Sequence, residues 1–297
     1  MTAYADLAAR FQAARPHLGA VAYRMLGSVA DAEDAVQEAW LRLTGVDAGQ
    51  VNNLDAWLTT AVARICLNVL RSRRARPPEE LVAQVPDPIV DAVGDVDPEH
   101  QAMLADAVGM ALFVILDSLA PAERLAFVLH DVFAVPFDQI APVVERTPEA
   151  TRKLASRARQ RIQQAAPSPD TDLVAQHSVV EAFFAAGRAG DLDRLVAVLD
   201  PEVSLRGDFG AAGQRSVRGA ATVAGLARSY AAPEREARPA VVNGAAGAVI
   251  FVDGQATAIM GFVVRGGRIA AIDVLADPER VAGIDLRAVT GGNRAAD

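Results

Sequence analysis

The sequence predicts a multidomain protein in which two all-α parts are followed by an α+β part. The chain has 297 residues, of which 52% are hydrophobic and 22% charged, enough for two or three domains that each bury a core. Apolar residues recur at helical spacing before residue 165, and strand-like runs follow residue 200. Proline-bearing segments divide the chain. We therefore expect all-α parts at 1–76 and 100–165, an acidic linker at 77–99, and the α+β part at 171–290.

Composition excludes several classes of protein and site. The strongly apolar run 107–116 is too short to span a bilayer, and the N-terminus carries Asp6 and lacks an apolar signal core, so we expect a cytoplasmic protein without membrane contact. Cys66 is the only cysteine, which excludes an intrachain disulfide and a zinc ribbon. There is no P-loop, HExxH, GxSxG or GxGxxG motif, and the histidines lack metal spacing, so no metal or cofactor is expected. These histidines are His17, His100, His130 and His177.

Charge is unevenly distributed along this acidic chain, whose formal net charge is −8. Residues 57–78 hold arginines and no acid, residues 77–123 hold acids and no Lys or Arg, and residues 150–166 are basic again. Basic segments inside an acidic protein mark local anion sites more sharply than uniform basicity would. The two basic blocks are therefore candidate nucleic-acid surfaces.

The first part is predicted to consist of helices. Residues 6–26 contain one breaker, Pro16, and Ser28 followed by Asp31 is typical of a capped start for a helix that runs to Leu43. On that helix Asp31, Asp34 and Glu38 share one face. Spacing alone favours a solvated face, with a partner-binding surface as the alternative.

A third helix is predicted from Leu54 to Arg74, ending before Pro77. One side of this helix is apolar and is expected to pack against a core. Another side is a polar ridge that ends in an arginine cluster. Arginine and asparagine beside Trp57 suit a nucleic-acid strand, because cations bind phosphate and planar groups bind exposed bases. A solvated helix is the equally weighted alternative. The apolar face is Leu58, Val62, Ile65 and Val69, and the ridge is Thr60, Arg64, Asn68 and Arg71.

The second part ends in a predicted helix-turn-helix. Helices are expected at 107–119, 121–131 and 137–144, followed by a turn at Glu145-Arg146. Thr147-Pro148-Glu149 is a strong start for a last helix to Ile162, with a cap, a proline and an acid in its first turn. Cap, turn and basic charge together favour DNA binding over a structural hairpin. Its inner face is expected at Ala150, Leu154 and Ala158.

Three ordered motifs resemble the extracytoplasmic-function (ECF) class of bacterial sigma factors. Region two is matched by Y-R-M-L-G-S at 23–28 with D-A-E-D-A-V-Q-E-A-W-L-R-L at 31–43, and by A-W-L-T-T-A-V-A-R-I-C-L-N at 56–68. Region four is matched by S-L-A-P-A-E-R at 118–124, F-D-Q-I-A at 137–141 and S-R-A-R at 156–159. The resemblance implies RNA polymerase core and promoter DNA as partners, with contacts to the β′ clamp helices and the β subunit.

The resemblance also assigns residues to each partner. It implies that the core polymerase binds Asp31, Glu33, Asp34, Gln37 and Glu38. It implies that the opened −10 element binds Asn52, Asn53, Trp57, Arg64, Asn68, Arg71, Arg73 and Arg74. It implies that the −35 duplex binds Thr147, Glu149, Arg152, Lys153, Ser156, Arg157 and Arg159.

The tail at 171–290 is predicted to begin with helices at 173–186 and 190–195. Strand-like runs follow at 203–206, 248–252, 256–264 and 269–274, with Gly266-Gly267 as a hairpin turn. This order resembles the SnoaL-like α+β cone with its curled antiparallel sheet, and a sigma factor with this tail resembles the SigJ-type ECF group. The group's D-G-G-G and W-L-P-E-P motifs are present only as G-D-F-G at 207–210 and V-P-D-P at 85–88. The resemblance implies that the tail modulates sigma activity within the same chain.

Cone folds also include isomerases and cyclases, which need a base in the cup. Asp208, Tyr230, Asp253 and Asp273 are candidates by residue type, but they form no paired motif. We therefore expect no catalytic residue and no enzyme, while a small ligand in the cup stays open. The alternatives are a helix-turn-helix DNA-binding regulator, or a SnoaL-type isomerase or cyclase with a DNA-binding appendage.

Overall fold

The computed structural model of the chain describes residues 2–45, 53–75, 85–94, 116, 119–165, 170, 172–230 and 232–290. These residues form two compact units. The first contains residues 2–75 and 116–165, and the second contains residues 85–94 and 170–290. Among the described residues, no helix is long and apolar enough to cross a membrane.

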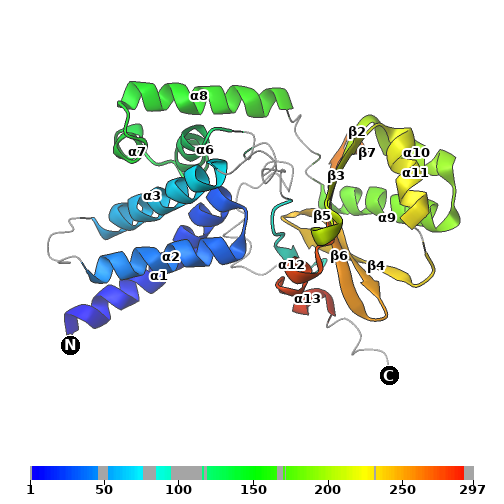
Figure 1. Cartoon of the computed structure of the whole chain (residues 1–297), viewed down its shortest axis with the longest axis horizontal. Coiled ribbons are helices and arrows are strands. Elements are labelled where there is room, and N and C mark those ends of the chain that lie inside the picture. Colours follow the sequence, from blue (N-terminus) through cyan, green and yellow to red (C-terminus); the bar gives the residue numbers. More distant parts are fainter. Residues whose placement is uncertain are drawn as a thin grey trace. The chain divides into compact units, whose positions relative to one another are not determined.

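Three helices begin the first unit: α1 (Thr2–Leu26), α2 (Val29–Thr44) and α3 (Leu54–Arg74) (Figure 1). Side-chain caps set the starts of the last two. Ser28 accepts a hydrogen bond from Asp31 N at 3.3 Å, and Asn53 Oδ1 accepts one from Ala56 N at 3.1 Å. The predicted bounds of both helices are thereby confirmed to within a residue. Their buried faces include Val36, Ala39, Leu43, Leu58, Val62 and Ile65.

The helix-turn-helix consists of α6 (Pro121–Phe127), the π-helical η3 (Val128–Val132), α7 (Phe137–Val144) and α8 (Pro148–Ala165). Glu145 ends α7 in the left-handed region at φ 58°, and Thr147 Oγ1 accepts from Ala150 N at 3.2 Å, as a helix cap does. The buried face of α8 is Thr151, Ala155 and Ala158, so the predicted positions Ala150 and Leu154 are one residue out of phase. The predicted helix at 107–119 lies almost entirely outside the described residues.

The second unit contains one seven-stranded sheet in the order β1-β4-β5-β6-β7-β2-β3. Gly266 and Gly267 form the predicted β6–β7 turn with φ of 56° and 72°, values that glycine adopts readily. The predicted antiparallel sheet is wrong at one pair, because β2 runs parallel to β7. The strands are β1 (Val90–Asp91), β2 (Leu199–Asp208), β3 (Gln214–Arg218), β4 (Arg235–Val242), β5 (Ala245–Val252), β6 (Gln255–Arg265) and β7 (Arg268–Leu275).

Helices pack on both faces of this sheet. The first face is covered by α9 (Leu173–Ala189), α10 (Leu192–Val198) and α11 (Ala220–Tyr230), over a core that contains Phe183 and Phe262. The second face carries Val249, Phe251 and Leu275 with the short helices α12 (Pro278–Ala282) and α13 (Arg287–Thr290). Strand alternation divides the residues between the two cores. The α+β fold class is thereby confirmed.

Part of the predicted linker at 77–99 is a component of this sheet. Its residues 90–91 form β1, which pairs with Val241 and Val242 of β4. Asn243, in the β4–β5 turn, makes two hydrogen bonds to the backbone of Ile89. Its side-chain Oδ1 accepts from Ile89 N at 2.8 Å, and its backbone N donates to Ile89 O at 2.9 Å. The segment 85–94 therefore packs with the tail. The rest of the linker lies outside the described residues.

Candidate polymerase and promoter surfaces

The exposed side of α2 is acidic. Glu33, Asp34, Gln37 and Glu38 are exposed, while the intervening Ala35, Val36 and Ala39 are buried against the bundle. Glu38 accepts a hydrogen bond from Arg42 Nε at 2.9 Å one turn later, and the pair is half exposed. An exposed row of acids repels DNA and suits a partner that presents basic side chains.

Leu41 extends this acidic row with an apolar side chain. It is 59% exposed, and it lies three and four residues after Glu38 and Gln37 on the same face of α2. A single exposed apolar side chain is ordinary on a protein surface, so Leu41 matters here only through its place beside the acidic row. The sequence analysis did not single out Leu41, although its register relative to the acids is visible in the sequence.

The exposed ridge of α3 carries part of the predicted −10 set. Arg64, Asn68 and Arg71 are exposed on one face, and Trp57 near the helix start is half-buried. Asn53 is occupied as the cap of α3, and Asn52 lies outside the described residues. The ridge therefore offers two guanidinium groups and one amide to a ligand.

A hollow of about 370 Å³ lies over this ridge. Arg42, from the last turn of α2, lines the hollow together with the three ridge side chains, as do residues of α7 and the adjoining Glu145. Three guanidinium groups and an amide suit phosphates and base edges. The residues lining the hollow are Arg42, Arg64, Leu67, Asn68, Arg71, Pro142, Val143 and Glu145.

Two arginines of the predicted −10 set lie outside this hollow. Arg73 donates to Asp31 Oδ2 at 2.5 Å and to Leu26 O at 3.1 Å, so it joins the ends of α1 and α3 to the start of α2. Arg74 donates to Leu119 O at 3.3 Å. The pairing also engages Asp31, a predicted polymerase contact. In this structure these groups hold the helices together.

The exposed side of α8 carries most of the predicted −35 set. Thr147, Glu149, Arg152, Lys153, Ser156 and Arg157 are all exposed. Hydrogen bonds from its own backbone and from Thr147 hold the pKa of the Glu149 carboxyl below its usual value. Arg159 instead donates to Asp131 at 2.7 Å. The part of α8 that is free for DNA is therefore its N-terminal half.

The acids considered for catalysis in the tail are bound to arginines or lie in turns. Arg280 Nη1 donates to Asp208 Oδ2 at 2.6 Å, and Arg206 Nη2 donates to Asp273 Oδ1 at 2.6 Å. Asp253 sits in the β5–β6 turn at φ 50°. Burial raises the pKa of the Asp273 carboxyl, and Arg206 opposes that rise. Tyr230's side chain lies outside the described residues.

Arg280 also binds the linker segment. Its Nη2 donates to Asp87 Oδ1 at 2.5 Å and to Val85 O at 2.5 Å, while its Nε donates to Asp87 Oδ1 at 2.9 Å. One guanidinium thus joins α12, β2 and the segment 85–94. Asp87 and Asp208 belong to the two sequence segments that only partly match the SigJ-type motifs.

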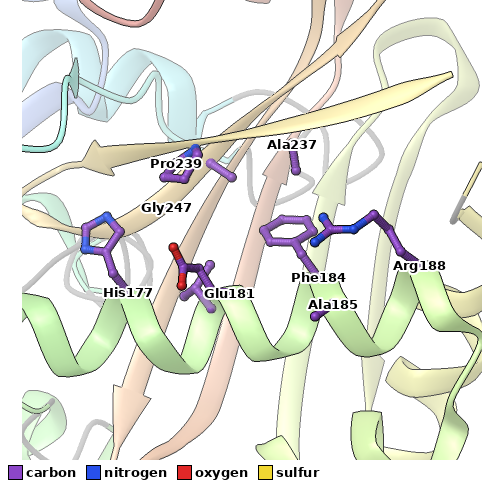
Figure 2. Close-up of a pocket in the computed structure, with 10 residues that line it drawn as sticks. His177, Glu181, Phe184, Ala185, Arg188, Ala237, Pro239 and Gly247 are labelled. Atoms are coloured by element: carbon purple, nitrogen blue, oxygen red, sulfur yellow. The ribbon is translucent and has the colours of Figure 1, made fainter. Parts of the chain in front are cut away.

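A groove of about 300 Å³ lies between α9 and strands β4 and β5 (Figure 2). His177, Glu181, Phe184 and Arg188 point into it from α9, and Pro239 lies on the opposite side. The His177 ring nitrogens lie 2.9 Å from Leu173 O and 3.1 Å from Ala240 O. His177 therefore ties the helix to the sheet. Among the described residues, no group of three or more His, Cys, Asp or Glu side chains could hold a metal ion.

Several known proteins are similar to this chain over most of its length. Residues 10–76 match the model of the family Sigma-70 region 2. The chain is 40% identical over 294 residues to the ECF RNA polymerase sigma factor SigJ of Mycobacterium tuberculosis (strain ATCC 25618 / H37Rv), with 93% of this chain and 94% of that protein covered. It is 34% identical to the probable ECF RNA polymerase sigma factor SigI of the same species (strain CDC 1551 / Oshkosh), over 98% of this chain and all of that protein.

Among solved structures, the crystal structure of the Mycobacterium tuberculosis ECF sigma factor SigJ aligns with a TM-score of 0.74 at 38% identity. The alignment covers 94% of this chain and 99% of that chain. The likeness therefore extends over the helical unit and the tail alike.

Proposed function

The chain belongs to the ECF sigma factors of RNA polymerase, which are not enzymes, and from this premise we propose which surfaces perform each step of promoter recognition. The observation that carries the proposal is the separation of charge in the helical unit. The exposed face of α2 is acidic, whereas the exposed faces of α3 and α8 are basic. One protein can thus bind a polymerase subunit and DNA at once.

The acidic row on α2 binds the core enzyme. Glu33, Asp34, Gln37 and Glu38 supply charge and hydrogen-bond acceptors to the β′ clamp helices, and Leu41 supplies apolar area at the same place. Charged groups set specificity and encounter rate, while an exposed apolar side chain adds affinity when it is buried.

The hollow over α3 binds the opened −10 strand. Arg64 and Arg71 bind phosphates, and Asn68 can both donate to and accept from a base edge. Arg42 lines the same hollow, but its Nε is paired with Glu38, so Arg64 and Arg71 are the phosphate contacts proposed here. Pro142 and Glu145 line the same hollow, so a strand bound there would also contact α7 and the adjoining turn.

The exposed face of α8 binds the −35 duplex in the major groove, as the second helix of a helix-turn-helix does. We expect Arg157→Ala to weaken binding of the holoenzyme to a −35 duplex about 10-fold, because a bidentate arginine contact is worth roughly 1–3 kcal/mol. Arg159→Ala serves as the matched control, since Arg159 is paired with Asp131. Fluorescence anisotropy measures both. Equal losses for the two variants would contradict the assignment.

The tail acts through the linker between the two sigma regions. Arg280, Asn243 and β4 bind residues 85–91 by side-chain and backbone hydrogen bonds, so the tail fixes part of the chain that connects the sigma regions. The conformations available to the chain between the two sigma regions then depend on whether residues 85–91 are bound to the tail. This supports modulation of sigma activity within one chain.

Arg280→Ala tests this role of the tail. We expect amide hydrogen exchange at residues 85–91 to rise at least about 10-fold, because the variant loses the hydrogen bonds to Asp87 and Val85. We also expect run-off transcription with core polymerase to change by several-fold. Arg287→Ala is the control, since the Arg287 side chain is exposed at the start of α13 and pairs with Asp285. Faster exchange with unchanged transcription would contradict regulation through the linker.

The groove beside α9 is a candidate place for a small ligand among the described residues of the tail. The space between the helices and the first face of the sheet is filled by Phe183, Phe184 and Phe262, whose ring centroids lie 5.5–5.8 Å apart. The groove carries an acid, Glu181, and a base, Arg188, beside small apolar residues of the strands. These groups do not select one class of ligand.

A further inference from the structure

We propose that His130, Phe137 and Arg152 form a stacked column that orients Arg152 as a guanine-reading residue of α8. The proposal rests on the −35 role of α8 and names the residue that fixes its specificity. Phe137 acts here as a positioning residue, because it touches Arg152 and not the DNA base.

Three elements contribute one layer each to the column. The His130 ring, from η3, stacks on the Phe137 ring at the start of α7, with centroids 3.7 Å apart and planes inclined by 29°. The Arg152 guanidinium, from α8, lies over the same Phe137 ring, with its Cζ 5.4 Å from the ring centroid. This distance is within the range of cation–π attraction. The layers therefore connect the recognition helix to the helix before the turn.

The His130 ring, on which Phe137 stacks, is itself held in place. His130 Nδ1 lies 3.0 Å from Val135 O, in the loop that leads to α7, and both His130 and Phe137 are half-buried. Rotation of either ring would break this contact or the stacking. The Phe137 ring therefore presents a fixed surface to Arg152, which itself is exposed.

The other cations on α8 differ from Arg152 in their surroundings. Arg159 and Arg161 are ion-paired, with Asp131 at 2.7 Å and Glu123 at 2.8 Å. Lys153 and Arg157 make no ion pair or ring contact with the described residues. Arg152 alone among the described cations of α8 is both oriented by a ring and unpaired with an acid. Arg152 lies in the second turn of α8. The residues near the N-terminus of a recognition helix are the ones that contact base edges.

Orientation matters because an arginine has many rotamers to lose on binding. A guanidinium held in place before DNA arrives loses less entropy per hydrogen bond. Its planar fork matches the O6 and N7 acceptors of guanine, which is the commonest specific contact in the major groove. Contact with Phe137 therefore makes Arg152 selective for the guanine of one G·C pair.

The test uses base preference, which packing alone would not change. A barcoded promoter library with a randomised −35 region is transcribed by bacterial core polymerase with the full-length chain, and the RNA barcodes are sequenced. We expect Arg152→Ala to erase preference for guanine at one position, by about 5-fold or more. Phe137→Leu should lower preference at that same position by roughly 2- to 5-fold. Phe137→Tyr keeps the ring and should keep the preference.

Arg157→Ala is the matched control, since it should change preference or affinity without touching the Arg152 position. If Phe137→Leu lowers the melting temperature but leaves base preference unchanged, the column is packing only and the inference is wrong. If Arg152→Ala changes no preference while Arg157→Ala does, α8 still reads the −35 element but the inference fails. If no α8 variant changes preference, the proposed −35 function fails as well.

Discussion

Asp34→Arg is expected to lower transcription that depends on this sigma factor by at least about 50-fold while leaving its fold intact. Asp34 is exposed in the middle of the acidic row on α2, and no core residue depends on it. Charge reversal replaces an attractive contact with a repulsive one, and removing one partner of a charge pair at an interface costs about 2–5 kcal/mol. A loss of roughly 2.4 kcal/mol corresponds to about 50-fold in affinity. Core binding and run-off transcription measure the effect.

Two further variants separate the electrostatic from the apolar contribution to core binding. Leu41→Ala removes apolar area at unchanged charge, so its loss of core affinity should persist at high salt, whereas the Asp34→Arg loss should shrink as salt screens the charges. Asp193→Arg places the same charge reversal on exposed α10 and should leave core binding unchanged. Unchanged core affinity of Asp34→Arg would refute the contact between α2 and the polymerase.

Local signals were sufficient to predict the helices that carry the site. Ser28 and Thr147 cap their helices through contacts three residues along the chain, and Asn53 does the same for α3. Such contacts depend on neighbouring residues alone, so they are visible in sequence. The exposure of Glu33, Asp34, Gln37 and Glu38 follows equally from helical periodicity and the apolar residues between them.

The partners of the arginines could not be predicted in this way. Arg73 pairs with Asp31 across 42 residues, and Arg159 pairs with Asp131 across 28. Whether an arginine on a basic helix faces DNA or an acid of its own chain depends on which helices pack together. Sequence spacing carries no information about that choice. Arg73 and Arg159 were therefore predicted to bind DNA in the same way as Arg71 and Arg157.

Three strands, β1, β3 and β4, were not predicted from the sequence. β4 contains Pro239, which weakens a strand pattern, and β1 is two residues long. The parallel pairing of β2 with β7 joins segments that are separated in the sequence by four strands, β3 to β6. The linker segment 85–94 shows little apolar periodicity, yet its Val85 and Val90 are buried in a core of the tail, and Arg280 and Asn243 add hydrogen bonds to the same segment.

Arg206→Met is expected to destabilise the tail by about 3–5 kcal/mol. The Asp273 side chain is 1% exposed and Arg206 is 19% exposed, so the variant leaves a buried carboxylate without its cation. Arg265→Met is the matched control, because the Arg265–Asp200 pair is more exposed at 35% and 20%, and should cost under about 1 kcal/mol. Urea unfolding followed by hydrogen exchange in the tail measures the two losses, because both tryptophans, Trp40 and Trp57, lie in the helical unit.

The pH dependence of the variant identifies the cause. Burial raises the pKa of Asp273 in the folded protein, and loss of Arg206 removes the main opposing influence, so the folded state binds a proton at higher pH than the unfolded chain. The cost of the charged carboxylate is therefore fully present above the folded pKa and disappears below the unfolded pKa, about 3.9. Relative to Arg265→Met, Arg206→Met should regain stability as pH falls from 7.5 towards 5.

A double variant, Arg206→Met with Asp273→Asn, completes the argument. It removes both charges while nearly keeping volume, so it should recover most of the stability lost by Arg206→Met and lose the additional pH dependence. Recovery would show that the pair is retained in the sheet although neither charge is needed for folding. A loss equal to that of Arg206→Met at every pH would mean that the arginine stabilises the sheet by packing its aliphatic stem rather than by neutralising Asp273.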